Sequence, residues 1–293
     1  MDFQTQWQQR ASLVEEALRT ELTREKPHNQ TLAQAMAYSL FAGGKRLRPV
    51  LLMAAADAVG KNGEDFITCA AALEMIHTYS LIHDDLPAMD NDDLRRGKPT
   101  NHKVYGEGMA ILAGDALLTY AFEVMLRQKN VSAQAKLAVV QEMSSAAGPL
   151  GMVGGQALDL ESEGQHLDQK TLYQMHMDKT GALFRAALRS GAILAEADDK
   201  ALQSLTHYAE AFGLAFQITD DILDATGDIA SVGKTVGSDV KNHKATYVTL
   251  LSLEKAQVLA ASTVQEAEDA LQALGTSADF LRQLARFLLT RKA

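Results

Sequence analysis

Apolar residues recur at helical spacing along almost the whole chain, and this periodicity limits the possible folds more than any other feature. Alanine and leucine occupy most of these positions. Alternating runs of valine, isoleucine and threonine, which indicate strands, are absent, and aromatic residues make up only 6% of the chain. With 293 residues, 47% of them hydrophobic, the chain can form a large helical core. We therefore expect an all-α fold.

The spacing predicts ten helices joined by loops. The helices are expected near residues 4–24, 31–41, 49–59, 64–85, 108–128, 132–147, 168–188, 199–226, 245–272 and 276–291. The loops are expected at residues 43–48, 90–103, 163–167 and 227–243. Because no linker, low-complexity tract or short repeat divides the chain, we expect one domain over residues 1–293, a single large bundle of about ten core helices. A domain of this size favours a dimer that shares core surface.

The charge balance excludes some classes of function. The chain carries 28 basic and 37 acidic residues, a net charge of -9, so we expect no nucleic-acid partner. The single cysteine, Cys69, suits a small core residue and a reducing compartment. The first ten residues are polar and lack a signal-peptide core, and Asp57 interrupts the short apolar run at residues 50–59. We therefore expect a cytoplasmic protein with no membrane span.

Two acidic motifs carry the strongest chemical signal. The first, DDLPAMD, runs from Asp84 to Asp90, and the second, DDILD, runs from Asp220 to Asp224; each ends a long apolar segment. Aspartates one helical turn apart repel by roughly 0.2–0.5 kcal/mol per pair even at the surface. A divalent cation turns this repulsion into attraction, and oxygen ligands with room for water and phosphate suit magnesium. The alternative, a solvated helix face, is weakened because two such motifs follow apolar helices.

The first motif needs a bend to act as one group. On a straight helix Asp84 and Asp90 would point about 120° apart. Pro87 removes a backbone donor and disfavours a straight continuation. We expect the chain to bend at Pro87 and bring Asp90 back towards Asp84.

Two basic clusters accompany the acidic motifs. GGKRLRP, at residues 43–49, gathers three cations in a glycine-led loop before a predicted helix, where close backbone approach and free N–H groups favour an anion. RRGK, at residues 95–98, follows the first acidic motif by five residues. Because these cations would repel magnesium, a diphosphate is the natural third component. The alternatives are a solvated loop for the first cluster and ion pairs with Asp92 and Asp93 for the second.

Four single residues add weaker signals. Lys179 lies in a helical pattern, Lys234 and Lys244 lie in and just after the loop that follows the second acidic motif, and His77 lies two helical turns before Asp84. Taken alone, each lysine also fits an ordinary surface position, and His77 also fits the core. The letters GKT at residues 233–235 resemble part of a P-loop, but the upstream glycine and the preceding strand are missing, so we reject nucleotide binding.

Together these features resemble the trans-isoprenyl diphosphate synthase family. The resemblance rests on the two acidic motifs, 136 residues apart, and on GGKRLRP, RRGKPTNH, GGQALDL, KTGALF and FQITDDILD; it spans roughly residues 43–250. It implies a helical bundle around a deep central cavity, usually a homodimer, that condenses isopentenyl diphosphate with an allylic diphosphate. It also implies Mg²⁺ as cofactor, about three ions with substrate bound. The first and last forty residues add little beyond helical character.

The resemblance implies roles for particular residues. The magnesium ligands would be Asp84, Asp90 and Asp220, the last supported by Asp221 and Asp224. Isopentenyl diphosphate would bind to Lys45, Arg48, His77 and Arg96. The allylic diphosphate would bind to Arg95, Lys179, Lys234 and Lys244.

The implied reaction is ionisation of the allylic C–O bond, condensation and loss of a proton. Magnesium and the lysines would stabilise charge on the departing diphosphate. Thr180 and Gln217, with the Lys179 carbonyl, would stabilise the carbocation, and Gln156 and Asp159 would line the same side. No side chain in these motifs is an obvious base, so the released diphosphate is the candidate base.

Product length can be argued from helix geometry. Tyr79 and Ser80 lie five and four residues before Asp84, which is ~6–8 Å along the helix axis. The bulky Tyr79 would close the hydrocarbon channel, and the two extra residues in the first acidic motif resemble bacterial farnesyl diphosphate synthases. We therefore expect farnesyl diphosphate, a C15 product. Ordinary packing of Tyr79 would leave geranyl (C10) and geranylgeranyl (C20) diphosphate open.

Three other classes compete with this interpretation. A terpene cyclase would not need the second diphosphate site that GGKRLRP and Arg96 indicate. A metal phosphohydrolase would match the His83–Asp84 pair, but it needs further histidine ligands. A non-catalytic subunit of a heteromeric synthase would be expected to lose an acidic motif, and both motifs are intact.

Overall fold

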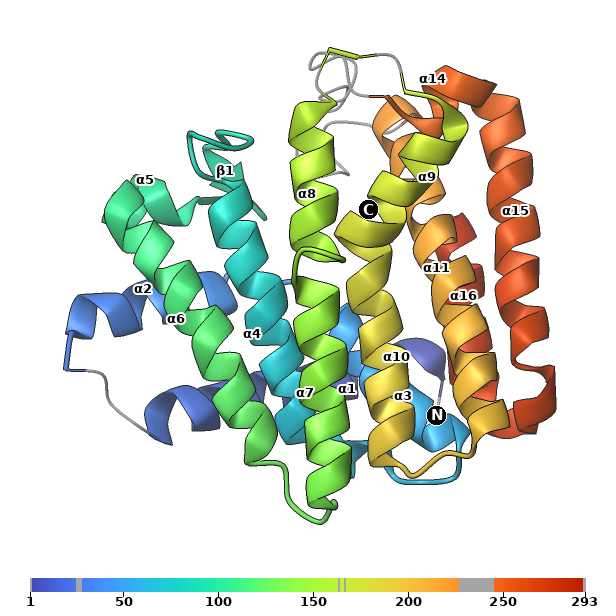
Figure 1. Cartoon of the computed structure of the whole chain (residues 1–293), viewed down its shortest axis with the longest axis horizontal. Helices are drawn as coiled ribbons and strands as arrows, with labels where there is room; N and C mark the ends of the chain where they lie inside the picture. The colour runs from blue at the N-terminus through green and yellow to red at the C-terminus, as the bar shows by residue number, and fades with distance from the viewer. Residues whose placement is uncertain (1, 25–27, 163, 166, 227–244, 292–293) are drawn as a thin grey trace.

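The structure is a computed structural model that describes residues 2–24, 28–162, 164, 165, 167–226 and 245–291. Helices make up nearly every element in this part of the chain, as Figure 1 shows. Its strands are two short ones, β1 (Leu94–Arg95) and β2 (Lys98–Pro99), which pair antiparallel as a hairpin. The expected all-α fold is confirmed.

Most predicted helices occur within a few residues of their expected bounds. The first half of the chain contains α1 (Phe3–Arg24), α2 (Gln30–Leu40), α3 (Leu47–Ala58), α4 (Ile67–Asp84), α5 (Asn101–Tyr105), α6 (Glu107–Leu126) and α7 (Ala133–Ala147). The second half contains α8 (Met152–Glu161), α9 (Gln169–His176), α10 (Ala182–Leu194), α11 (Asp199–Thr226), α14 (Tyr247–Leu251), α15 (Leu253–Ala270) and α16 (Asp279–Thr290). Short turns of 3-10 or π helix precede α4, α10 and α16; they are η1 (Gly63–Phe66), η2 (Met177–Gly181) and η3 (Gln272–Ala278).

Helix α3 lies inside the core and is buried on all sides. Residues 49–56 are all buried, and a helix that is apolar all round is stable only inside a protein. Helix α10 approaches it closely, because a Cβ on Gly191 would lie 2.1 Å from the Leu52 carbonyl oxygen. The apolar run at residues 50–59 is therefore a core helix.

Helix α6 has the length and composition of a membrane span, with a mean hydropathy of 1.6 over its most apolar 18-residue window. The apolar run considered in the sequence was the one at residues 50–59, so α6 was not expected to meet this test. Helix α6 packs against α4, and the core helix of a globular protein meets the same test. Length and composition are therefore weak evidence that α6 crosses a membrane.

The ends of the helices bring the two acidic motifs to one side of the bundle. Helices α4 and α11 both end towards the upper side of Figure 1, where the β1–β2 hairpin, α8 and α14 also lie. A small second core, separate from the main one, fills the space between α9, α11, α14 and α15; its buried members are Leu172, Met175, Ile218, Tyr247, Ala256 and Ala260. The second acidic motif therefore begins beside a packed apolar cluster.

Several helical features differ from the prediction. The helix expected over residues 245–272 is two elements, α14 and α15, and α5 begins inside the loop expected at residues 90–103. Helix α8 was not expected, because the segment that begins it contains several glycines. The helix expected over residues 168–188 is three elements, α9, the π turn η2 and α10, and it continues to Leu194. The loop expected at residues 227–243 lies outside the described residues.

Candidate active site

The first acidic motif lies where α4 ends and the chain turns back. Helix α4 ends at Asp84, and the Asp90 amide donates a hydrogen bond to the Asp84 carbonyl at 2.9 Å. The Asn91 amide donates to the Leu86 carbonyl at 3.0 Å, and Asn91 adopts the left-handed conformation with a φ of 52°. The bend predicted at Pro87 is confirmed, and it brings the Asp90 backbone beside Asp84.

Asp85 is buried within this motif and holds Arg95. Its Oδ1 accepts hydrogen bonds from Arg95 Nε at 2.7 Å and from Arg95 Nη2. Burial raises the pKa of Asp85, and Arg95 acts in the opposite direction. Arg95 Nη2 also lies 4.0 Å from Asp84 and 3.6 Å from Asp92. Arg95 therefore contacts the acidic motif directly, and the ion pair with Asp92 that the sequence left open as an alternative is present.

Helix α8 connects the first acidic motif to η2. Gln156 Nε2 donates to Asp84 Oδ1 at 2.9 Å, and Lys179 Nζ donates to Asp159 Oδ2 at 2.7 Å. Gln156 and Asp159 are three residues apart and share one face of α8. Gly155 permits close packing, because a Cβ there would lie 2.1 Å from the Lys179 amide nitrogen. Helix α8 therefore sets the spacing between Asp84 and Lys179.

Lys179 and Thr180 lie in η2, a single π-helical turn. Such turns interrupt the regular hydrogen-bond ladder and are frequent at functional sites. Helix α11 packs closely on this turn, since a Cβ on Gly213 would lie 3.1 Å from the Gly181 Cα. Gln217 is half-buried and lies one turn after Gly213 on the same face of α11. The face that carries Gln217 therefore packs towards η2.

The aspartates of the second motif have different surroundings on the last two turns of α11. The Asp220 side chain is 43% exposed, and its Oδ1 accepts a hydrogen bond from Arg291 Nη2 at 2.5 Å. Asp221 is buried, and its Oδ2 accepts from the Tyr247 amide at 2.7 Å. Asp224 is half-buried one turn after Asp220. Asp221 thus ties α14 to α11, whereas Asp220 and Asp224 remain accessible.

The β1–β2 hairpin brings Arg96 to the glycine-led basic loop. Arg96 and Gly97 have φ values of 54° and 73°, the positive values of a type I′ hairpin turn. Arg96 Nη1 donates to the Gly43 carbonyl. Glycine is required at position 44, where φ is 122° and a Cβ would lie 2.5 Å from Arg96 Nη1. The two basic clusters recognised in the sequence therefore meet in space.

Arg48 and His77 lie side by side between α3 and α4. Arg48 Nη1 is 3.4 Å from His77 Nε2, and the Arg48 guanidinium lies over the Phe184 ring at 4.5 Å. Burial lowers the pKa of Arg48 to about 10, whereas Glu74 and Asp220 act in the opposite direction. Burial lowers the pKa of His77 well below its usual range, and Arg48 adds to this effect. His77 is therefore neutral at pH 7.

The basic loop and the second acidic motif lie within electrostatic range of each other. Desolvation lowers the pKa of Lys45, Arg291 lowers it further, and Asp220 raises it. Asp220 also acts on Arg48. The carboxylate of Asp220 is therefore near enough to these cations to favour their charged state.

The residues expected to set product length lie on α4. Tyr79 is 5% exposed, and its ring meets the His83 ring edge-on with centroids 5.7 Å apart. His83 packs against Gly114 of α6, where a Cβ would lie 2.1 Å from His83 Nε2. Ser80 Oγ donates to the His77 carbonyl at 2.8 Å. His83 therefore packs between Tyr79 and Gly114. This packing role argues against a metal-binding pair of His83 and Asp84.

Two predicted site residues, Lys234 and Lys244, lie outside the described residues. Within the part of the chain that is described, no group of three histidine, cysteine, aspartate or glutamate side chains is close enough to hold a metal ion alone. Magnesium in phosphate-transfer sites uses one or two carboxylates together with water and substrate oxygens. The accessible carboxylates of the two motifs fit that pattern, which needs no closed protein cage.

Residues near both ends of the chain contribute to the site, contrary to expectation. Arg291, just after α16, contacts Asp220 and also donates to the Thr219 hydroxyl at 2.9 Å. Trp7 Nε1 in α1 donates to the Lys45 carbonyl at 2.7 Å. A lone arginine or tryptophan in a helical segment gives no motif, so the sequence offered no signal for either contact.

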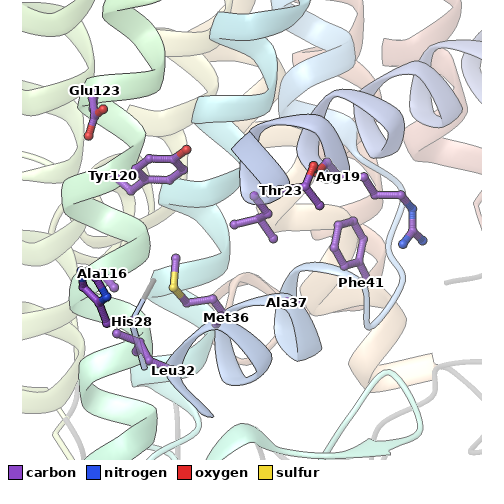
Figure 2. Close-up of a pocket in the computed structure, with 12 residues that line it drawn as sticks. Arg19, Thr23, His28, Leu32, Met36, Ala37, Phe41, Ala116, Tyr120 and Glu123 are labelled. Atoms are coloured by element: carbon purple, nitrogen blue, oxygen red, sulfur yellow. The ribbon is translucent and has the colours of Figure 1, made fainter. Parts of the chain in front are cut away.

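A cavity of about 640 Å³ lies away from the acidic motifs, between α1, α2 and α6. Figure 2 shows Arg19 and Thr23 from α1, Met36 from α2, and Tyr120 from α6 around it. None of the predicted site residues that the structure describes lines this cavity. This cavity therefore does not mark the proposed reaction site.

Comparisons with known proteins point to one family. Residues 29–276 match the family model of polyprenyl synthetase. A farnesyl diphosphate synthase from Geobacillus stearothermophilus is 52% identical over 239 residues, 81% of this chain and 80% of that protein. A geranylgeranyl diphosphate synthase from Cyanophora paradoxa is 45% identical over 97% of this chain and 94% of its own. The apo crystal structure of an FPP/GFPP synthase from Zymomonas mobilis matches with a TM-score of 0.88 and 40% identity, covering 98% of both chains.

Proposed function

Because this chain belongs to the polyprenyl synthetase family, we propose that it is a prenyltransferase that makes farnesyl diphosphate from isopentenyl diphosphate and an allylic diphosphate. Relatives called farnesyl diphosphate synthase from Micrococcus luteus, Haemophilus influenzae and Escherichia coli also share 45–47% identity over at least 96% of this chain. The reaction is a head-to-tail condensation in which the allylic C–O bond breaks and a new C–C bond forms.

One observation carries this proposal: two basic clusters meet close to both acidic motifs. Arg96 reaches the loop of Lys45 through the Gly43 carbonyl, and Arg95 contacts the first acidic motif. Asp220 of the second motif is near enough to raise the pKa of Lys45 and Arg48 in or beside the loop. A condensation of two diphosphates needs two anion sites with metal ligands beside them, and this arrangement supplies both.

We propose Mg²⁺ as the cofactor, held by Asp84, Asp90 and Asp220. The exposed carboxylate of Asp220 and the paired backbones of Asp84 and Asp90 support this assignment. Bound magnesium would stabilise negative charge on the departing diphosphate. We propose that about three Mg²⁺ ions are present when substrate is bound.

Different residues of the chain would bind the two diphosphates and stabilise the allylic cation. We propose that Lys45, Arg48, His77 and Arg96 bind the diphosphate of isopentenyl diphosphate, and that Arg95, Lys179, Lys234 and Lys244 bind the allylic one. Lys179 is oriented for this by Asp159. Thr180 and Gln217, with the Lys179 carbonyl in the π turn, would direct their dipoles at the allylic cation. The released diphosphate would accept the proton.

Product length is proposed to depend on Tyr79, with Ser80 beside it. Tyr79 is buried and backed by His83, so the ring has little room to move aside. A fixed aromatic side chain one to two turns before Asp84 favours a short product. Geranylgeranyl diphosphate synthesis is the second candidate, because a relative of that name aligns over nearly the whole chain.

A product-length assay with three allylic primers tests the proposed function. Purified protein is incubated with labelled isopentenyl diphosphate, Mg²⁺ and either dimethylallyl, geranyl or farnesyl diphosphate, and product length is measured. Accumulation of C15 from the first two primers, with no extension of the third, supports the proposal. Extension of farnesyl diphosphate to C20 would favour the second candidate, and no condensation with any primer would refute both.

A homodimer, a single domain over residues 1–293 and a cytoplasmic location are further parts of the proposal. Helix α6 supports the dimer, because only 39% of its most apolar window is buried within the chain. Ile111 and Leu112 on this helix are 44% and 53% exposed. A second copy would cover this apolar face, which sedimentation velocity of the purified chain tests.

A further inference from the structure

One of the three cations in the basic loop between α2 and α3 differs from the other two. Lys45 is exposed and Arg48 is half-buried, whereas the side chain of Arg46 is fully buried. Arg46 directly precedes α3, and its backbone is left-handed, with a φ of 51° and a ψ of 37°. Residues other than glycine adopt this conformation rarely, so the surrounding structure must hold Arg46 in it.

The buried guanidinium of Arg46 joins three helices. Its Nη1 donates to Glu74 Oε1 on α4 at 2.8 Å. Its Nη2 donates to the Leu40 carbonyl at the end of α2 at 2.7 Å and to Glu15 Oε1 on α1 at 3.2 Å. Glu74 is itself only 2% exposed. Because removal of one partner would leave a buried charge unpaired, this set of contacts fixes the guanidinium in one place.

The fixed side chain determines where the neighbouring backbone lies. The Arg46 carbonyl accepts a hydrogen bond from the Val50 amide at 3.1 Å, which begins α3. The carbonyl of Lys45 is held independently by Trp7 Nε1 of α1. The backbone is therefore anchored on both sides of the turn, and the side chains of Lys45 and Arg48 leave it in a set direction.

Glu74 links this anchor to the cations that would meet substrate. Burial lowers the pKa of Arg48 and of Arg96, and the Glu74 carboxylate opposes the change at both residues. The same carboxylate that holds Arg46 therefore also favours the charged state of two cations proposed to bind a diphosphate.

We propose that Arg46 is a positioning residue for the isopentenyl diphosphate site, because its buried contacts fix the turn from which Lys45 and Arg48 reach the diphosphate. This inference rests on the proposed function of the loop. Arg46 acts through its neighbours and does not itself touch substrate, since its guanidinium points into the protein and binds groups of the chain.

The test is Arg46→Lys, which keeps the charge but loses the planar fork that serves three acceptors. The Michaelis constant for isopentenyl diphosphate should rise about tenfold. The reason is that the lost guanidinium hydrogen bonds no longer hold the turn from which Lys45 and Arg48 reach the diphosphate. The constant for geranyl diphosphate should change less than about twofold. Emission of Trp7, the only tryptophan in the chain, should shift to longer wavelength as the Lys45 carbonyl moves away from the indole.

The matched control is Arg189→Lys on α10. Arg189 also makes a two-pronged ion pair, donating to Glu142 at 2.9 and 2.7 Å, and contacts Thr206 at 3.0 Å. This variant should lower the melting temperature without changing either Michaelis constant. Glu15→Ala, which removes the most exposed partner of Arg46, is a milder variant and should raise the isopentenyl diphosphate constant about threefold.

The kinetic results distinguish a positioning role of Arg46 from a purely structural one. A selective rise for isopentenyl diphosphate in Arg46→Lys or Glu15→Ala supports the inference. If both constants stay unchanged or rise equally in the variants, Arg46 is a stability residue and the inference is wrong, while the proposed function stands. If the wild-type protein condenses isopentenyl diphosphate with none of the allylic primers, the proposed function fails and the inference falls with it.

Discussion

The contact between α8 and the π turn gives the sharpest test of how this site is built. Replacement of Gly155 by alanine would place a Cβ 2.1 Å from the Lys179 amide nitrogen and 2.6 Å from the Lys179 Cα. The obstacle is backbone, so no change of rotamer can relieve the clash. Ordinary contact begins at 3.4 Å, so the two segments must separate by 3.4 − 2.1 = 1.3 Å at this point.

The separation of α8 from η2 would change the distance between Asp84 and Lys179. Helix α8 carries Gln156 and Asp159, which bond to Asp84 at 2.9 Å and to Lys179 at 2.7 Å. A shift of about 1 Å in groups that position a substrate can reduce the rate about 100-fold. Overpacking of this kind destabilises by about 1–3 kcal/mol, which lowers the melting temperature by several degrees in a chain of this size.

Steady-state kinetics and thermal unfolding followed by circular dichroism measure both effects. The control is Gly108→Ala on α6, where a Cβ meets nothing within 4 Å. There alanine should stabilise the helix by up to about 1 kcal/mol and leave kcat unchanged. If Gly155→Ala retained the wild-type kcat, the idea that α8 sets the spacing between Asp84 and Lys179 would be refuted. An unchanged melting temperature would refute the packing argument itself.

Four further substitutions test the proposed residue roles. Asp84→Ala or Asp220→Ala should reduce condensation by at least about 1,000-fold and leave the helical circular dichroism spectrum unchanged; retained turnover would exclude a metal-binding role. Tyr79→Ala should lengthen the product beyond C15, measured by chromatography of the dephosphorylated alcohols, and an unchanged product would remove Tyr79 as the limit on chain length. Arg96→Ala should raise the Michaelis constant for isopentenyl diphosphate about tenfold or more and that for geranyl diphosphate less, because one charged contact is lost; the reverse order would exchange the two sites.

Helix positions were predictable because the pattern that decides them is local. The apolar spacing located α1, α4, α7 and α11 to within a few residues. Helix α8 was missed because Gly154 and Gly155 lower helix propensity by about 1 kcal/mol each relative to alanine. In the structure, a Cβ on either residue would meet backbone at 2.1 Å, at Pro149 or Lys179. The glycines therefore serve close packing, and a local propensity cannot reveal that.

The candidate site was predictable where its residues form motifs and hidden where they come from distant segments. The bend at Pro87 followed from the missing backbone donor of proline, and the structure bears it out. The pairing of Arg291 with Asp220 joins residues 71 positions apart, and neither the spacing nor the composition of α16 indicates it. Long-range contacts of single residues depend on how whole helices pack, which the sequence pattern does not specify.

Burial explains which members of a charged motif build the site and which are available to bind. A cation that receives a diphosphate must stay accessible until the ligand arrives, whereas one that shapes the loop must already have its counter-charges inside the chain. Arg46 meets the second condition and Lys45 the first. The acidic motif divides in the same way, since Asp221 is buried on the Tyr247 amide and the Asp220 side chain is 43% exposed. Neighbouring residues with the same charge therefore have opposite tasks, and substitutions at Arg46 or Asp221 should reduce stability as well as activity.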